Sequence, residues 1–213
     1  MCRVMKTGST SFRESFSRME GVVLDGNKAF GAHYSMDQIR EDVSEEIYQN
    51  YFKFALVRNP WDRVASYYVW ACKGGKSIQS LEPYDKFIES IKPSFYNFVK
   101  GFESYKPSLI FSIKSFLKKS LKIEFDASYM NPDFKGFLLP QIDFIKGVDF
   151  IGKLEDVGNV YSYISKKLEL PFVPLKQYNR TFKPFYREFY NDETRDIIAK
   201  HYAKDIKAFE YTF

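Results

Sequence analysis

The chain has 213 residues and a mass of 25.1 kDa, enough for one ordinary domain that buries its own core without disulfides or metals. Its two cysteines and two histidines are too few for a disulfide framework or a four-ligand zinc site, and most of its 22 Phe and 16 Tyr must lie in the core. The net charge of +5 favours anionic partners, which include nucleic acid, acidic polysaccharide and phosphorylated cofactors.

The chain begins with a pattern of strand, loop and helix. Residues 2–6 are apolar or basic and predict a short strand. The loop that follows has a lysine, a glycine and four hydroxyl residues within the letters KTGSTS, from Lys6 to Ser11. The next letters, SFRESFSRM, carry apolar side chains at three- and four-residue spacing, which predicts an amphipathic helix.

A second unit of the same kind follows. The letters KAFGAHY, residues 28–34, predict a strand, and residues 36–51 carry apolar side chains along one helical face. Ser35 is the expected N-cap of this single helix. Gln38 lies three residues later, at the position that completes a capping box.

The third unit has the clearest pattern. The letters FKFALV, residues 52–57, are typical of a buried strand. Asn59 and Pro60 then offer an N-cap and a first helical position for a helix that runs to about Cys72. Strands that alternate with helices predict a parallel sheet covered on both faces, and ligands of such sheets bind at the carboxyl ends of the strands.

The second half of the chain is less regular. About residues 73–145 predict helices rich in Phe, Tyr and Lys, and we expect them to form an insertion that shapes the acceptor site rather than a separate domain. The expected elements beyond it are a strand at 148–154, a helix at 155–168 and one closing helix at 191–209 with Asp192 near its cap. We therefore expect a single domain over residues 1–213.

The loop after the first strand has the composition of an anion site. Backbone amides at a glycine-containing turn before a helix point outward together, and the helix dipole adds positive potential. Lys6 would add a mobile charge, while short donors would come from Thr7, Ser9, Thr10 and Ser11 around Gly8. Because the lysine precedes the glycine, the loop departs from the ATP-binding pattern, and a nucleotide kinase is disfavoured. By itself, the loop fits a solvated turn with helix-capping serines equally well.

Arg58 and Ser66 form a second candidate site. Arg58 ends the third strand, and Ser66 lies about two helical turns beyond the next helix cap. A phosphorylated nucleotide that lies along the flank of that helix could contact both side chains. When these residues are taken in isolation, the favoured alternative is an ion pair between Arg58 and Asp62, with Ser66 permitting close helix packing.

The two stretches together, KTGSTSF and VRNPWDRVASYY, resemble the two cofactor-binding motifs of sulfotransferases that use 3′-phosphoadenosine 5′-phosphosulfate (PAPS). The letters FIGKLEDV and residues 178–213 resemble the carbohydrate branch of these enzymes, sulfotransferase family 2. The stretch RVMKTGSTSF is most similar to the first motif of the uronosyl 2-O-sulfotransferases. The resemblance implies an α/β fold that is P-loop-like, with three α/β/α layers around a central parallel sheet and a helical insertion.

The resemblance also implies which residues bind the cofactor. In the family, the first loop binds the 5′-phosphosulfate, and the arginine and serine of the second motif bind the 3′-phosphate. Carried over to this chain, the first site comprises Lys6, Thr7, Gly8, Ser9, Thr10 and Ser11, and the second comprises Arg58 and Ser66. Arg180 and Thr181 fall in a loop that closes over the nucleotide in the family. PAPS is then the donor and adenosine 3′,5′-bisphosphate (PAP) the product.

Sulfuryl transfer to a hydroxyl needs a base, a clamp and a cation. Lys6 is the expected cation beside the leaving phosphate, and no metal is required because that group already leaves well. His33 is the expected base, because it ends the second predicted strand and because the ordinary histidine pKa of about 6.5 suits neutral pH. The uronosyl enzymes also have a histidine after the second strand, and the same resemblance implies that Arg3 faces the acceptor. The alternative for His33 is a histidine that caps the next helix beside Ser35.

The expected activity is that of a sulfotransferase of EC 2.8.2 type, with a hydroxyl-bearing glycan as acceptor and no nucleic-acid partner. The alternative is a non-catalytic basic module that binds a polyanionic glycan or nucleic acid through the middle region, where lysines cluster at 114–122. His201 is expected to be a packing or surface residue, and Glu155 and Asp156 a helix start.

No run of about 18 apolar residues is present, and the first residues lack the pattern of a signal peptide. We therefore expect no membrane segment. The low cysteine count fits a reducing compartment. The expected location is the cytoplasm of a microbe, or the Golgi lumen if an N-terminal anchor has been removed.

Overall fold

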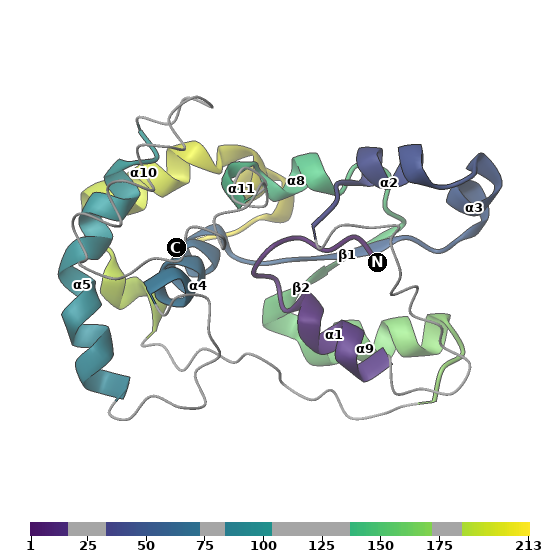
Figure 1. The fold of residues 1–213 in the computed structure, drawn as a ribbon, viewed down its shortest axis with the longest axis horizontal. Coiled ribbons are helices and arrows are strands. Elements are labelled where there is room, and N and C mark those ends of the chain that lie inside the picture. Colours follow the sequence, from purple (N-terminus) through teal and green to yellow (C-terminus); the bar gives the residue numbers. More distant parts are fainter. Residues whose placement is uncertain (17–32, 73–83, 104–136, 172–184) are drawn as a thin grey trace. The chain divides into compact units, whose positions relative to one another are not determined.

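The computed structural model describes residues 1–16, 33–72, 84–103, 137–171 and 185–213 (Figure 1). These residues fall into two compact units. The first unit comprises Met1–Arg58 and Gln141–Asn179, and the second comprises Asn59–Pro140 and Arg180–Phe213.

The first unit is built on a small parallel sheet. Strands β1, Phe54–Val57, and β2, Phe150–Lys153, pair in parallel over their whole length. The N-terminal segment joins the other side of β1 through a bridge at Cys2, whose N–H donates to the Phe54 carbonyl at 2.8 Å. The strands expected at 52–57 and 148–154 are thus confirmed in their central residues. The first expected strand is limited to this bridge.

The strand expected at 28–34 falls largely outside the described residues. Its last two residues, His33 and Tyr34, are described and are not part of a strand. The central parallel sheet of the described residues therefore contains two strands and the Cys2 bridge.

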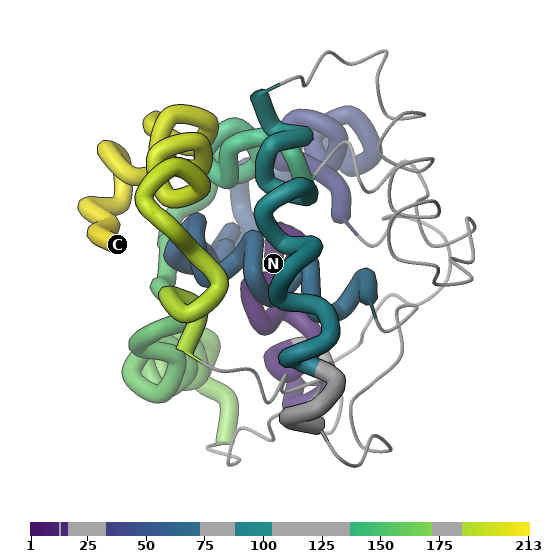
Figure 2. The backbone as a smooth tube through the Cα atoms, turned by 90° about the vertical axis from the view of Figure 1, so that its left-hand side faces the viewer, coloured from purple at the N-terminus to yellow at the C-terminus, as the bar shows by residue number. Residues whose placement is uncertain are grey.

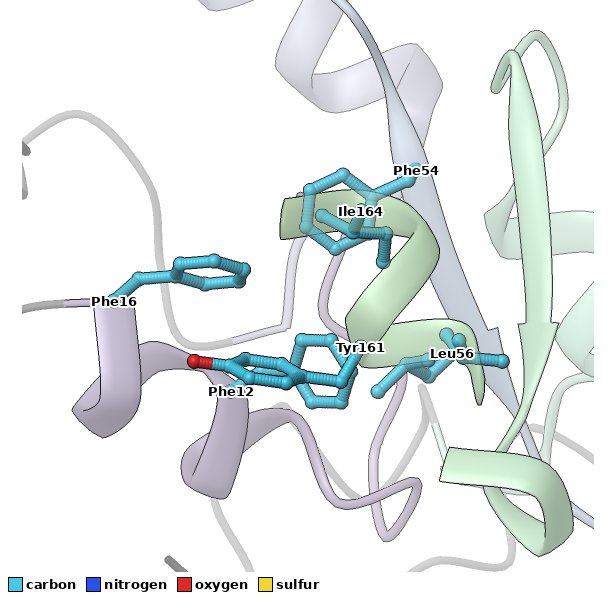
Figure 3. Packing of buried hydrophobic residues seen from close by; sticks show 7 residues of the cluster. Phe12, Phe16, Phe54, Leu56, Tyr161 and Ile164 are labelled. Carbon is cyan, nitrogen blue, oxygen red and sulfur yellow. The ribbon is translucent and has the colours of Figure 1, made fainter. Parts of the chain in front are cut away.

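Helices α1, Ser9–Phe16, and α9, Val157–Lys167, pack against one face of the strands (Figure 1). The cluster between them is aromatic and aliphatic, and its buried members are Phe12, Phe16, Phe54, Leu56, Val160, Tyr161 and Ile164 (Figure 3). Phe12 meets the Tyr161 ring edge-on at a centroid distance of 5.4 Å. Alternate side chains of a strand point to the same face, so Phe54 and Leu56 reach this cluster together. All four residues of β1 are buried.

A short 3-10 helix, η3, Leu154–Asp156, connects β2 to α9. The helix expected at 155–168 therefore begins as an α-helix only at Val157. Gly152 in β2 allows α9 to approach closely. A Cβ atom at this position would lie 2.4 Å from Cγ1 of Val160. The glycine is therefore needed for the contact between β2 and α9.

On the other side of the strands lies α2, Met36–Asp42, followed by α3, Glu45–Asn50 (Figure 1). The expected capping box is confirmed, because the Ser35 side chain accepts from the Gln38 N–H and the Gln38 side chain accepts from the Ser35 N–H. The expectation of one helix over 36–51 is wrong. Val43 and Ser44 are extended, and the Ser44 hydroxyl accepts from the Ile47 N–H, so a second helix begins there.

The second unit contains helices α4, Pro60–Cys72, and α5, Tyr84–Lys100, of which α4 confirms the helix expected after Asn59. The Asn59 side chain accepts from the Trp61 N–H at 3.1 Å, and Pro60 is the first helical residue. Figure 2 shows α5 running beside the segment that leads into α10, Asp192–His201. The Lys100 ammonium of α5 donates to Glu193 of α10 at 2.9 Å.

Aromatic rings form the core of the second unit, in accord with the expected burial of Phe and Tyr. The Tyr67 ring stacks on Phe137 at a centroid distance of 4.0 Å, and Tyr68 lies edge-on to Phe95 at 5.1 Å. The Tyr68 hydroxyl donates to the Ile91 carbonyl, so the buried polar end of this ring is satisfied.

The closing helix expected at 191–209 is two helices. Asn191 is the N-cap of α10, in a capping box with Thr194, and Asp192 follows the cap directly as expected. The helical geometry breaks at Tyr202, and α11, Ala203–Phe209, follows. The Tyr202 hydroxyl donates to the Phe137 carbonyl at 3.0 Å, so this buried side chain is held where the helix breaks.

Candidate functional site

The loop Lys6–Ser11 connects the bridged N-terminal segment to α1 through two residues with left-handed backbone. Lys6 has φ 65° and Gly8 has φ 75°. Glycine adopts this conformation readily, whereas a lysine does so at a cost, and strain of this kind gathers at functional sites. The Thr7 hydroxyl donates to the Val4 carbonyl at 2.9 Å, so its proton braces the loop itself.

Helix α1 begins at Ser9, earlier than its apolar pattern indicates, so Ser9, Thr10 and Ser11 form its first turn. The Ser11 N–H donates to the Gly8 carbonyl at 3.0 Å. The N–H groups of a first helical turn have no partners further back in their own helix, and they lie at the positive end of the helix dipole. The loop and the helix start therefore combine in the arrangement expected of an anion site.

Leu154 supports this loop from the start of η3. A Cβ atom at Gly8 would lie only 2.6 Å from Cδ1 of Leu154. The loop thus needs glycine both for its positive φ and for the space that Leu154 occupies.

Arg58 contacts the same loop from the end of β1. Its Nη1 donates to the main-chain carbonyl of Lys6 at 3.1 Å. Burial, followed by the positive charge of Arg58, lowers the pKa of the Lys6 ammonium to about 7. Two basic side chains are therefore held close together at the carboxyl end of β1, and a bound anion would favour the charged form of Lys6.

The main chain of Arg58 is held by Gln141, which begins helix α8, Gln141–Phe144. The Gln141 Oε1 atom accepts from the Arg58 N–H at 3.0 Å, and the Gln141 Nε2 atom donates to the Arg58 carbonyl at 2.8 Å. Gln141 has no exposed surface. No motif in the sequence marks Gln141, and the one local signal is its position as an isolated amide between Pro140 and Ile142.

His33 lies beside the N-terminal segment. Its Nδ1 atom is 2.9 Å from the Arg3 carbonyl. A carbonyl oxygen only accepts, so this contact places a proton on Nδ1 and makes Nε2 the basic nitrogen of the neutral ring. The His33 imidazole is thus held in the tautomer that a base acting through Nε2 requires.

The remaining expected site residues are placed as follows. Ser66 lies on α4 in the second unit and is buried. Arg180 and Thr181 lie outside the described residues, as do the lysines at 114–122. The residues of the expected insertion are described at 84–103 and from 137 onward, and the first of these parts contains α5.

His201, Glu155 and Asp156 have the structural positions that the sequence favours. The His201 Nε2 atom is 2.8 Å from the Leu138 carbonyl, and its ring packs edge-on against Phe102. Burial lowers the pKa of His201. Glu155 and Asp156 lie at the start of α9, where the Asp156 carboxylate accepts from the Asn159 side chain.

Within the described ranges, no three His, Cys, Asp or Glu side chains come together in a group that could hold a metal ion. In the same parts of the chain, no helix is long and apolar enough to cross a membrane. The described cysteines, Cys2 and Cys72, are buried and free.

Comparison with known proteins gives one family. The family model described as "Sulfotransferase family" matches residues 1–212. No curated protein and no solved structure matches the chain. The family match covers the loop Lys6–Ser11, the end of β1 and nearly all of the remaining sequence. The small parallel sheet with its helices is consistent with an α/β sulfotransferase fold. The chain belongs to the sulfotransferase family and is a transferase of EC 2.8.2 type.

Proposed function

We propose that this protein transfers the sulfuryl group of PAPS to a hydroxyl group of a carbohydrate. The observation that carries the proposal is the convergence of His33 and Arg58 on one short segment. His33 contacts the Arg3 carbonyl, and Arg58 contacts the Lys6 carbonyl. A candidate base and two cations are thereby gathered along residues 3–6, beside the start of α1.

Lys6 and His33 carry the proposed chemistry. The acceptor oxygen attacks the sulfur atom while the bond from sulfur to the bridging oxygen of the 5′-phosphate breaks. The hydroxyl proton passes to Nε2 of His33, and the Lys6 ammonium neutralises the charge that develops on the bridging oxygen. The segment that carries Lys6 also carries Arg3, so we propose that Arg3 contacts the acceptor.

The nucleotide is bound by two groups of residues in this proposal. The loop amides and hydroxyls from Lys6 to Ser11 hold the 5′-phosphosulfate. Thr7 contributes its main chain because its hydroxyl donates to Val4, and Ser11 contributes its hydroxyl because its N–H donates to Gly8. Arg58 and Ser66 hold the 3′-phosphate, and Arg180 and Thr181 close over the nucleotide. A guanidinium suits this role because it offers paired donors to phosphate oxygens.

The proposed architecture is one sulfotransferase domain over residues 1–213, with a P-loop-like arrangement of three α/β/α layers. The likeness of the first motif to the uronosyl 2-O-sulfotransferases supports a uronic-acid-containing glycan as acceptor. A histidine held with Nε2 as its basic nitrogen agrees with that likeness.

Thermal unfolding with nucleotides tests the proposal first. A ligand that binds only the folded state at 100 times its Kd stabilises it by about 2.7 kcal/mol. For a chain of this length, that raises Tm by about 5–10 °C. PAP should produce this shift, whereas ATP with Mg²⁺ should not. If millimolar PAP leaves Tm unchanged, the nucleotide site is wrong, and retention on a polyanion column would then favour the basic binding module.

Transfer itself is tested with labelled PAPS and a panel of glycans with and without uronic acids. Label should enter an acceptor with a free hydroxyl. It should be absent from that acceptor when PAP, the product that occupies the same nucleotide site, is supplied in excess. Binding of PAP without transfer to any member of a broad panel would contradict the choice of a carbohydrate acceptor.

A further inference from the structure

The side-chain amide of Gln141 takes the place of a neighbouring strand at the end of β1. Strand β2 pairs with β1 only as far as Val57 and Lys153. The next residue, Arg58, has its N–H and carbonyl bonded to Oε1 and Nε2 of Gln141, at 3.0 and 2.8 Å. The amide thus supplies hydrogen-bond partners for the main-chain N–H and carbonyl of Arg58 at the point where the pairing of β1 with β2 ends.

The contact requires a planar group with one donor and one acceptor, which a side-chain amide supplies at every pH without having to change its protonation state. Gln141 is fully buried, so a lost hydrogen bond here leaves a buried main-chain group unsatisfied. The main chain of Arg58 is fixed in this way immediately before Pro60 begins α4. The Cα atom from which the Arg58 side chain extends therefore has a defined position.

We propose that Gln141 is the positioning residue for Arg58 and thereby sets the selectivity of the enzyme for nucleotides with a 3′-phosphate. This inference rests on the proposed function, in which Arg58 binds that phosphate. Gln141 holds the main chain of Arg58, and the Arg58 guanidinium holds the carbonyl of Lys6. Two phosphate-binding side chains from different parts of the sequence are thus placed by one buried amide.

The experiment measures the Kd of PAP and of adenosine 5′-monophosphate for the full chain and for Gln141→Met, which keeps the length of the side chain but removes both hydrogen bonds. We expect PAP affinity to fall by about tenfold or more, as a lost contact of about 1.4 kcal/mol requires. Affinity for the monophosphate, which has no 3′-phosphate to reach Arg58, should fall less, because it loses only the support that Arg58 gives to the loop at Lys6. In Gln141→Met, the ratio of the Kd of PAP to the Kd of the monophosphate should approach the ratio measured in Arg58→Ala.

Ile164→Val is the control for lost stability, because Ile164 is a fully buried residue of the hydrophobic cluster between α1 and α9. This variant should keep the ratio of the full chain. A purely structural role for Gln141 predicts the same unchanged ratio in Gln141→Met, and that result overturns the inference. A full chain that fails to bind PAP would instead overturn the proposed function, so the two failures are distinguishable.

Gln141→Glu provides a second test that does not depend on Gln141→Met folding well. The introduced carboxylate can accept from the Arg58 N–H but repels the Arg58 carbonyl, whereas the protonated carboxyl can donate to that carbonyl as the amide does. The preference of Gln141→Glu for PAP, relative to the full chain at the same pH, should therefore recover as pH falls. Two results would contradict the role of Gln141: a preference for PAP in Gln141→Glu that equals that of the full chain at every pH, or a loss of preference that grows as pH falls.

Discussion

The Arg58 guanidinium donates to the main-chain carbonyl of Lys6 across 3.1 Å, although 52 residues separate the two in the sequence. Lys6 has left-handed backbone, so its carbonyl is held in a conformation that lysine seldom adopts. Arg58 therefore has two roles in the proposed enzyme. It binds the 3′-phosphate of the nucleotide, and it stabilises the loop that binds the 5′-phosphosulfate.

Arg58→Ala should weaken PAP binding by about tenfold to a hundredfold, because a hydrogen bond to a charged group is worth about 1.5–3 kcal/mol. Arg58→Lys should recover only part of this affinity, because an ammonium lacks the planar fork of donors. Calorimetric titration measures both. Arg40→Ala is the matched control, since this exposed arginine pairs with Glu45 on the surface. Equal losses in the two alanine variants would point to a general charge effect.

His33→Ala should lower the turnover number by about a hundredfold to ten-thousandfold, the usual contribution of a general base. PAP affinity should remain that of the full chain, because His33 contacts the main chain of Arg3 rather than the nucleotide loop. Transfer assays with PAP titrations separate these effects. His201→Ala is the control: it removes the hydrogen bond to the Leu138 carbonyl and should lower Tm, while the folded protein keeps its activity. Full activity in His33→Ala would exclude His33 as the base.

Lys6→Met should stabilise the nucleotide-free protein at neutral pH. The pKa of Lys6 is about 7 in the folded chain, against about 10.4 for an unperturbed lysine. Between these values the unfolded chain binds the extra proton, so the free energy of unfolding of the full chain rises with pH. Below that window the folded full chain carries the buried charge and its whole cost. We expect the free energy of unfolding of Lys6→Met to exceed that of the full chain by at least about 1 kcal/mol there.

Urea unfolding of both proteins from pH 6 to pH 10, taken as about the range of the titration, measures this difference. The advantage of Lys6→Met should shrink toward the alkaline end, while transfer is lost throughout. Lys146→Met, at an exposed lysine, is the control and should show no such trend. A difference that grows with pH would contradict the lowered pKa of Lys6.

Gly8→Ala should lower the stability of the folded chain by about 1–2 kcal/mol from its positive φ alone, and the contact of its Cβ with Leu154 adds to this. PAP binding should fall with it, because the anion loop must move. Gly158→Ala is the matched control: nothing lies within 4 Å of its Cβ, and alanine favours the helix α9 by up to about 1 kcal/mol. Thermal unfolding with and without PAP compares the two. Equal stability changes would show that Gly8 has no special conformation.

Local patterns predict several elements well. The apolar run at β1 and the pair Asn59–Pro60 at the start of α4 are confirmed because burial and capping depend on neighbouring residues. The break between α2 and α3 is missed because the apolar face continues through it, and the second cap at Ser44 was not recognised within that pattern.

The sequence alone determined the composition of the loop Lys6–Ser11, the strand and helix within residues 52–72, and the resemblance to sulfotransferases that the family match supports. Only the tertiary structure decided which groups meet. Gln141 binds the main chain of Arg58, Arg58 binds that of Lys6, and His33 contacts that of Arg3, across 83, 52 and 30 residues. Every residue has a main-chain carbonyl, so no letter of the sequence marks the ones that accept these contacts.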